Sequence, residues 1–167
     1  FKITVTASGA TVSDLKGKGG TDTLANVDRL VFKDGHVALD IDGVAGQAYR
    51  LYAAAFDRTP DKAGLGYWIA SMDKGLSLTN AAGSFAVSKE FQDLYGAHTS
   101  DAQFIDLLYQ NTLHRAPDAA GRDWWVDTMH DHGLSRAEVL ANFSESGENQ
   151  AQVIGSIQNG IDFMPWL

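Results

Sequence analysis

The stretch R-T-P-D-K-A-G-L-G-Y-W, residues 58–68, returns in related form as R-A-P-D-A-A-G-R-D-W-W at residues 115–125. Both segments follow the pattern R-x-P-D-x-x-G-x-x-x-W, and every member of the pattern is shifted by the same constant offset. Leu51-Tyr52 precedes the first segment, and Leu108-Tyr109 precedes the second at that same offset. Self-similarity at a fixed spacing indicates that one supersecondary unit is used twice in the chain.

The repeat continues beyond these segments after one inserted residue. Gly75-Leu76-Ser77 matches Gly133-Leu134-Ser135, one position later than the constant offset would place it. Two copies are too few for an open solenoid, which needs about three units to bury a continuous core. We therefore expect a closed bundle with approximate two-fold symmetry, whose copies span about residues 47–95 and 104–152.

The repeated pattern has a direct interpretation as a helix start. Thr59-Pro60-Asp61 predicts a capping residue, then proline at the first helical position, then an acid that favours the helix dipole. The glycine allows another backbone to come close. The tryptophan lies about two turns further on and can anchor the core. Trp68 and Trp125 are therefore expected at equivalent core positions, and ion or sugar binding by the acids is the alternative interpretation.

Residues 44–167 show helical patterning throughout. The apolar positions in 48–56 and 104–113 follow helical spacing. Ser100 with Gln103, and Ser135 with Glu138, have the spacing of a capping box. About eight helices of one to four turns are expected in this part of the chain.

Residues 1–43 show strand patterning instead. Ile3–Thr6 is β-branched and alternating, and 37–41 is an apolar segment of strand length. Asp34-Gly35 before that segment has the composition of a tight hairpin turn. The fold class expected from the sequence is therefore α+β, with a small N-terminal β-segment at 1–43 and an all-α bundle of two repeats at 44–167.

Composition excludes several classes of function. The chain has 167 residues, 13 basic and 21 acidic side chains, and a net charge of −8. This acidity argues against a nucleic-acid partner, which would need a basic face. We expect no transmembrane segment, because no apolar run approaches the roughly 18–20 residues of a membrane span. Cysteine is absent, which removes disulfides and thiol nucleophiles.

The helical repeat resembles a known family. The residues that carry the resemblance are Tyr49–Tyr52, Phe56–Asp61, and Phe143–Ser146, within about residues 46–160. They look like the bacterial domain-of-unknown-function family 4214. The resemblance implies an all-helical module of large exported or cell-surface proteins. That family is distantly similar to the phycobilisome linker domain, a helical fold that docks to other proteins.

The N-terminal part carries a second resemblance. Gly17–Leu24, G-K-G-G-T-D-T-L, is similar to one turn of the RTX (haemolysin-type) calcium-binding nonapeptide, with Lys18 in place of the second glycine. Asn26–Gly35 is similar to the segment that often closes an RTX β-roll. The resemblance implies type 1 secretion, an extracellular or cell-surface location, and calcium near Asp22. The alternative is a glycine-rich turn in which an aspartate caps the backbone.

Four further acids are candidate calcium ligands, and calcium is the only cofactor that the sequence suggests. Asp40 and Asp42 have the spacing of oxygen ligands in calcium loops, although the full EF-hand pattern is absent. Asp57 and Asp61 flank an arginine at a helix junction. The alternative for Asp40 and Asp42 is a solvated linker turn.

His130-Asp131-His132 is expected to be a solvated helix end, because residues two apart on a helix do not share a face.

Two classes of function remain open from the sequence. The first is a non-catalytic binding or attachment module that docks to a protein or glycan at the cell surface. The second is a carbohydrate-active or lytic enzyme with acids between the two repeats, for which Glu145 and Glu148 are the candidates. The sequence contains no nucleophile elbow, P-loop or dinucleotide fingerprint, which favours the binding module.

A binding module needs exposed anchors, and aromatic side chains are the usual ones. Tyr67, Tyr95, Trp124 and Trp166 are the candidates, because they lie outside the best-defined core positions. Two similar repeats would present two similar faces, which suits bridging or self-association. The alternative is that Tyr67 and Trp124 are buried beside the neighbouring tryptophans.

Overall fold

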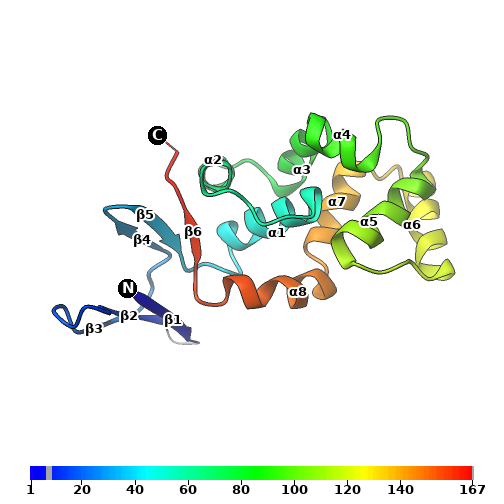
Figure 1. Ribbon diagram of the computed structural model, residues 1–167. Coiled ribbons are helices and arrows are strands. Elements are labelled where there is room, and N and C mark those ends of the chain that lie inside the picture. Colours follow the sequence, from blue (N-terminus) through cyan, green and yellow to red (C-terminus); the bar gives the residue numbers. More distant parts are fainter. Residues whose placement is uncertain (7–8, 167) are drawn as a thin grey trace.

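The computed structural model describes residues 1–6 and 9–166. The chain has the α+β architecture that its sequence predicts, with a small β-segment followed by helices (Figure 1). The first sheet is antiparallel and contains β1 (Lys2–Thr6), β2 (Gly9–Ser13) and β3 (Thr21–Leu24) in that order. The second sheet is also antiparallel and contains β4 (Arg29–Phe32), β5 (Gly35–Ala38) and β6 (Ile161–Phe163).

The hairpin between β4 and β5 forms where the sequence predicts a turn, but its loop is shifted by one residue. Phe32 pairs with Gly35, so Lys33 and Asp34 form the loop and Gly35 begins β5. The pairing places Val37 of β5 in the core. The next residue, Ala38, points to the opposite face of the sheet and is also buried, so both faces of the strand are covered at its end.

The third strand of the second sheet comes from the far end of the chain. Ile161 of β6 pairs with Ala38 of β5, and Phe163 pairs with His36. Residues 161–163 lie in the segment that the sequence assigns to the helical bundle. In Figure 1, β6 lies between the β4–β5 hairpin and α2 (Lys62–Asp73). The second sheet therefore joins the β-segment to the end of the helical part.

Eight helices lie in the described part of the chain. The first copy of the repeat contains α1 (Val44–Phe56), α2, α3 (Leu78–Ala86) and α4 (Lys89–Tyr95). The second contains α5 (Asp101–Leu113), α6 (Ala119–His132), α7 (Arg136–Ser144) and α8 (Gly147–Ile157). Both ends of α5 are shifted from those of α1 by the constant offset of the sequence repeat. Both predicted capping boxes are confirmed, at Ser100 before α5 and at Ser135 before α7.

The two copies close on each other through equivalent helices. Helix α1 contacts α5 and α7, and α3 contacts α7. These contacts bury one continuous hydrophobic core that both copies share. Its largest fully buried side chains are Leu51, Leu65, Ile69, Tyr95, Phe104, Ile105, Leu108, Leu140 and Ile157. Burial between the copies explains why two units suffice without further repeats.

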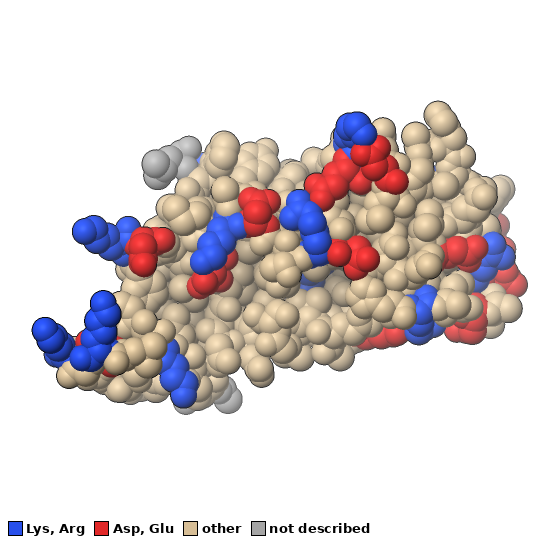
Figure 2. Space-filling model, viewed as in Figure 1, with Lys and Arg blue, Asp and Glu red and all other residues tan. Residues whose placement is uncertain are grey.

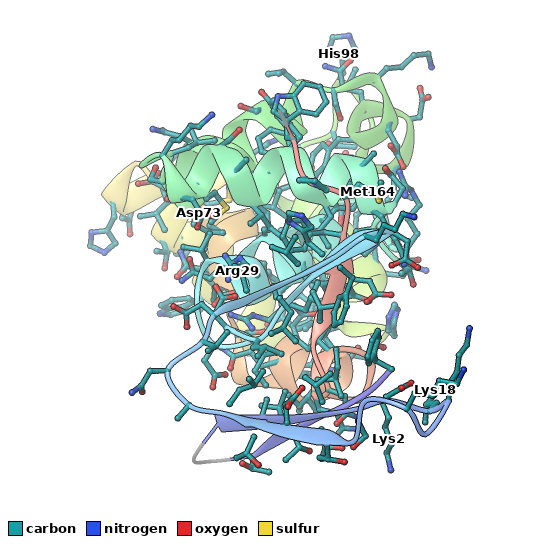
Figure 3. All side chains as sticks on the ribbon, turned by 90° about the vertical axis from the view of Figure 1, so that its left-hand side faces the viewer. Lys2, Lys18, Arg29, Asp73, His98 and Met164 are labelled. Atoms are coloured by element: carbon teal, nitrogen blue, oxygen red, sulfur yellow. The ribbon has the colours of Figure 1, made fainter. Side chains whose placement is uncertain are left out.

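A charged cluster joins the β-segment to the first copy. Arg29 on β4 pairs with Asp40, and the second carboxylate oxygen of Asp40 accepts the N–H of Ala45 at 3.1 Å, in the first turn of α1. Arg29 also reaches Asp73 at the end of α2, at 3.4 Å (Figure 3). One arginine therefore connects the second sheet to two helices.

Where charged side chains gather on the helical part in Figure 2, acidic and basic groups lie beside one another. Basic side chains gather at the end formed by the first sheet, where Figure 3 labels Lys2 and Lys18. Within the described ranges, none of the helices combines the length and the apolar character that a membrane crossing requires.

Candidate binding surface

The aspartate of the repeated pattern caps a helix in both copies. Asp61 accepts the N–H of Gly64 at 2.7 Å, and Asp118 accepts the N–H of Gly121 at 2.8 Å. The N-cap of α2 is therefore Asp61, and the prediction that Thr59 caps this helix is wrong. An aspartate at the N-cap reaches the N–H three residues on, which explains the fixed spacing of aspartate and glycine in the pattern. These acids have a folding role in both copies.

The arginine of the pattern makes a bidentate ion pair in each copy. Arg58 binds Glu90 through two contacts of 2.7 and 3.2 Å. Arg115 binds Glu148 through two contacts of 2.6 and 2.9 Å. Each pair connects the loop before the second helix of a copy to the fourth helix of that copy. The arginine lowers the pKa of Glu148, and Glu90 raises the pKa of Arg58.

A tyrosine completes this network in the first copy. The hydroxyl of Tyr52 donates to Asp61 at 2.9 Å and accepts from Arg58 at 2.9 Å. The pKa of Asp61 is lowered, first by the N–H of Gly64 and then by the Tyr52 hydroxyl. Burial raises the pKa of Tyr52, and the hydrogen bond to Asp61 raises it further. The polar residues of the pattern are therefore engaged with one another.

The tryptophans of the pattern occupy equivalent positions, as the sequence predicts. Trp68 packs edge-on against Phe85 with ring centroids 4.4 Å apart, and Trp125 packs against Phe143 at 5.1 Å. Phe85 and Phe143 are themselves repeat equivalents. Both tryptophans are half-buried against the main core. They anchor the second helix of each copy and remain partly exposed.

The residue before each tryptophan points outward. Tyr67 is 40% exposed, and Trp124 at the equivalent position is 58% exposed. Each ring touches its tryptophan neighbour edge-on, at centroid distances of 5.0 and 4.8 Å. The alternative that these two residues are buried is wrong. We call the exposed rings of Tyr67 on α2 and Trp124 on α6 the two aromatic faces.

The C-terminal segment extends the first aromatic face. The ring of Trp166 lies edge-on to Tyr67 at 5.1 Å and is 57% exposed. Met164 lies in the same segment and is also exposed (Figure 3). Tyr67 of α2 and Trp166 of the segment after β6 therefore meet at one surface. The sequence identifies Tyr67 and Trp166 separately, but only the fold brings them together.

A glycine on α2 allows this segment to approach. The N–H of Met164 donates to the carbonyl of Lys62 at 2.9 Å. A Cβ atom on Gly66 would lie 1.7 Å from the carbonyl oxygen of Met164, so a side chain cannot fit there. The equivalent residue in the second copy is Asp123. The same close approach is therefore blocked at the second aromatic face.

Tyr95 is not an exposed anchor, and this expectation from the sequence is wrong. Only 1% of the residue is exposed. Its ring stacks on Phe91 at 4.1 Å, and its hydroxyl donates to the carbonyl of Ala54 at 2.9 Å. Burial raises the pKa of this phenol to about 12. The position at the end of α4 looks peripheral in the sequence, but α4 packs against α1 and carries Tyr95 inward.

The five candidate calcium ligands lie in three places. Asp22 is exposed on β3, Asp40 and Asp42 lie in the turn before α1, and Asp57 and Asp61 flank the α1–α2 junction. Asp40 is engaged by an arginine and by a helix N-terminus. Among the described residues, no group of three or more histidine, aspartate or glutamate side chains is arranged to hold a metal ion.

An aspartate that is not among the candidates from the sequence, Asp14, organises the glycine-rich loop before β3. The carboxylate of Asp14 accepts the N–H groups of Lys16, Lys18 and Gly19 at 2.8, 3.1 and 2.9 Å. These bonds lower the pKa of Asp14, and the bond from Lys16 has the largest effect. The loop is thus a turn capped by an aspartate, but the capping residue is Asp14 and not Asp22. Asp14 lies two residues before Lys16, the first donor, and this spacing is the sequence signal of such a turn.

The acids proposed for catalysis belong to separate ion pairs. Glu145 binds Arg50 through two contacts of 2.7 Å, whereas Glu148 binds Arg115. Arg50 is only 4% exposed and also donates to the carbonyl of Ile41 at 2.8 Å. In the sequence, this buried pair is indicated by Arg50, a charged residue within the apolar pattern of α1. His130 and His132 are exposed at the end of α6, as expected.

Comparison with known proteins gives one match. Residues 82–153 match the family model described as Domain of unknown function (DUF4214). The match begins within α3, ends within α8 and contains all of α4, α5, α6 and α7. It supports the resemblance of the helical part to this family. Neither the curated proteins nor the solved structures give a match to the chain.

Proposed function

We propose that this chain is a non-catalytic binding module that docks to a protein or a glycan at the bacterial cell surface through its two aromatic faces. One observation carries the proposal. Tyr67 and Trp124 occupy equivalent positions of the two copies, and both rings are exposed. Large aromatic side chains that are exposed at matched positions of two repeats indicate a binding role. Tyrosine and tryptophan are also the residues that dominate binding hot spots.

The surroundings of these rings support a binding role. The other side chains of the repeated pattern are engaged: Asp61 and Asp118 cap helices, and Arg58 and Arg115 hold glutamates. The rings of Tyr67 and Trp124 lie one residue before the tryptophan of the pattern, and they stay open to a partner. A flat ring offers apolar contact at a low cost in conformational entropy.

The state of the candidate acids favours binding over catalysis. A general acid must hold a proton near neutral pH, which requires a raised pKa. The pKa of Glu148 is lowered by Arg115, so this carboxyl holds its charge more firmly than usual. Glu145 is clamped by a different arginine, Arg50. Each of the two carboxylates is therefore held by its own arginine, which suits a structural role.

Export and calcium dependence are part of the proposal. The family match and the RTX resemblance support an exported, cell-surface protein with a calcium-dependent segment. The net charge of −8 fits this setting, because bound cations offset repulsion between carboxylates. The proposed ligands are Asp22 on β3 and, at a separate place, Asp40 and Asp42 in the turn before α1. Calorimetric titration of calcium into a chelator-treated sample tests this part of the proposal. The absence of any heat of binding up to millimolar calcium would rule out calcium dependence.

A glycan array and a cross-linking experiment on bacterial envelopes test the docking role. The intact chain is compared with Tyr67→Ala and Trp124→Ala, and with Val87→Ser as a control for an exposed apolar residue outside the aromatic faces. We expect binding to fall by about tenfold or more in each aromatic variant and to stay unchanged in the control. The opposite result would be turnover of a glycan, peptide or ester substrate by the parent chain, with loss of that turnover in Glu145→Gln or Glu148→Gln. That result would show that the chain is an enzyme and not a binding module.

A further inference from the structure

The outer side of α6 is the open counterpart of a surface that is covered in the first copy. On α2, strand β6 and the segment after it lie against the helix, and Trp166 packs on Tyr67. Helix α6 packs mainly on α5, at the end of the molecule away from the sheets (Figure 1). Trp124 is 58% exposed there. We call this tryptophan and the three exposed aspartates beside it the α6 face, which comprises Asp123, Trp124, Asp127 and Asp131.

The two surfaces have the same local geometry. The rings of Tyr67 and Trp68 lie 5.0 Å apart with their planes at 81°, and those of Trp124 and Trp125 lie 4.8 Å apart at 75°. An aspartate caps the N-terminus of both helices. The surface on α2 holds a strand followed by a segment with an aromatic ring. A polypeptide segment is therefore the occupant that the first copy indicates for the α6 face.

The α6 face differs from its counterpart in charge. Three acids of α6 replace uncharged or basic residues of α2: Asp123 replaces Gly66, Asp127 replaces Ala70, and Asp131 replaces Lys74. Within the described part of the chain, no hydrogen bond or ion pair engages these three carboxylates. The arginine of α6, Arg122, is held by Asp106 on α5 at 2.9 Å. The α6 face therefore carries three negative charges without a cation of its own.

These acids are unfavourable for the stability of α6 itself. Like charges four residues apart repel each other on a helix surface. Asp131 also lies in the last turn, where the helix dipole disfavours a carboxylate. The first copy follows the usual preference, because Lys74 is the C-cap of α2. Residues that oppose the stability of their own helix are typical of functional positions.

The spacing of the three acids matches an extended chain. Residues four apart on a helix recur about every 6 Å along its axis, because each residue rises about 1.5 Å. Alternate residues of a strand point to one side and recur about every 6.6 Å. An extended segment that lies along α6 can therefore place one basic side chain opposite each acid.

We infer that the α6 face docks an extended basic segment of a partner protein, with lysine or arginine at alternate positions. This inference rests on the proposed docking function and names the partner of the second aromatic face. Charge complementarity selects a basic segment, because the three carboxylates lack cations. A cation beside Trp124 also gains from the face of the ring. Since Asp123 prevents the close backbone approach that Gly66 allows, side chains hold the partner here.

Titration of the intact chain with three synthetic peptides, followed by NMR, tests this inference. The basic peptide is acetyl-Phe-Lys-Gly-Lys-Gly-Lys-amide, and the matched peptides carry glutamine or glutamate in place of each lysine. We expect the basic peptide to bind saturably and to shift the indole N–H signal of Trp124, which Trp124→Phe assigns. The matched peptides should leave this signal in place. Added salt should weaken binding of the basic peptide, because it screens exposed charges.

The double variant Asp127→Asn/Asp131→Asn separates binding from folding. Removal of the two charges relieves repulsion along α6, so the melting temperature should stay equal or rise. Affinity for the basic peptide should fall by about fivefold or more. The control Asp28→Asn/Asp34→Asn removes the same charge from exposed positions outside the α6 face and should bind as the parent does.

Four results of the titration would overturn the inference. The first is the absence of binding of the basic peptide up to about 10 mM, where the free energy of association is small. The second is equal binding of the glutamine peptide. The third is an Asp127→Asn/Asp131→Asn variant that keeps the affinity of the parent chain. The fourth is a Trp124 signal that shifts with the concentration of the chain alone, which would make a second copy the occupant.

Retention on bacterial envelopes distinguishes failure of this inference from failure of the docking role. Loss of retention in both Trp124→Ala and Asp127→Asn/Asp131→Asn supports the basic partner. Loss in Trp124→Ala alone would leave the docking role standing and overturn the basic partner. Unchanged retention in Tyr67→Ala/Trp124→Ala would remove the docking role itself, and the inference with it.

Discussion

The carboxylate of Asp57 and the imidazole of His114 lie 3.8 Å apart, and the two residues are equivalents of each other in the repeat. Each is the C-cap of the first helix of its copy, and each has a left-handed backbone. The two copies therefore touch through their own corresponding residues. This contact shows how two units close into one bundle without a third.

The tryptophans should contribute similarly to stability in both copies. Trp68→Ala and Trp125→Ala each remove a ring packed against a buried phenylalanine. Because both rings are half-buried, we expect losses of about 2–4 kcal/mol in the free energy of unfolding. Denaturant unfolding of the two variants is the measurement. Variants that unfold like the parent chain would show that the rings are not anchors.

The buried ion pair should matter far more than the exposed pairs. Arg50→Ala leaves Glu145 without its partner in a partly buried place, and we expect a loss of about 3 kcal/mol. Arg115→Ala breaks a pair that is about 40% exposed on both sides, and we expect about 1 kcal/mol or less. Chemical denaturation in low and high salt checks both values. Equal losses would contradict the distinction between the two pairs.

Gly66 should be required for the C-terminal segment to stay on α2. In Gly66→Ala, the new methyl group would overlap the carbonyl of Met164, so the segment must shift. We expect Trp166 to become more accessible to a fluorescence quencher and the C-terminus more accessible to protease. Asp123→Ala changes the equivalent position of the second copy and serves as the control. An unchanged Trp166 signal in Gly66→Ala would show that the segment is not held there.

Acid should weaken the fold through the lowered pKa values of its carboxyl groups. Arg115 lowers the pKa of Glu148, so this pair adds stability above the unfolded-state pKa of about 4.3 and loses it as the pH falls through the lower folded-state value. Glu148→Gln should therefore be less stable than the parent at pH 7 and equally stable in strong acid. Unfolding measured over a pH series tests this, and parallel curves for the two proteins would refute it.

The sequence predicts the features that depend on local chemistry. The nearly constant offset between the copies identifies the helices of the second copy from those of the first. The capping boxes at Ser100 and Ser135 mark helix starts correctly, because the groups that satisfy each other lie three residues apart. Even here one local prediction is wrong: the sequence favours Thr59 as the cap of α2, but the structure uses Asp61, which can also cap a helix.

The features that the sequence does not predict depend on contacts between distant segments. Strand β6 pairs with β5 across the whole helical part, and nothing near residue 161 identifies that partner. Tyr95 is buried because α4 folds against α1, although it ends its helix and is followed directly by Gly96. The Arg50–Glu145 pair joins the two copies at positions that the repeat does not share. Trp166 meets Tyr67 only because Gly66 admits the segment after β6.

Binding of the labelled chain to intact bacterial envelopes tests the central claim most directly. The retained fraction is measured for the parent chain, for the Tyr67→Ala/Trp124→Ala double variant, and for the Val87→Ser control. The two aromatic faces predict saturable retention of the parent and the control, and loss of most retention in the double variant while its melting temperature stays close to that of the parent. Equal retention of the double variant and the parent would contradict docking through these rings.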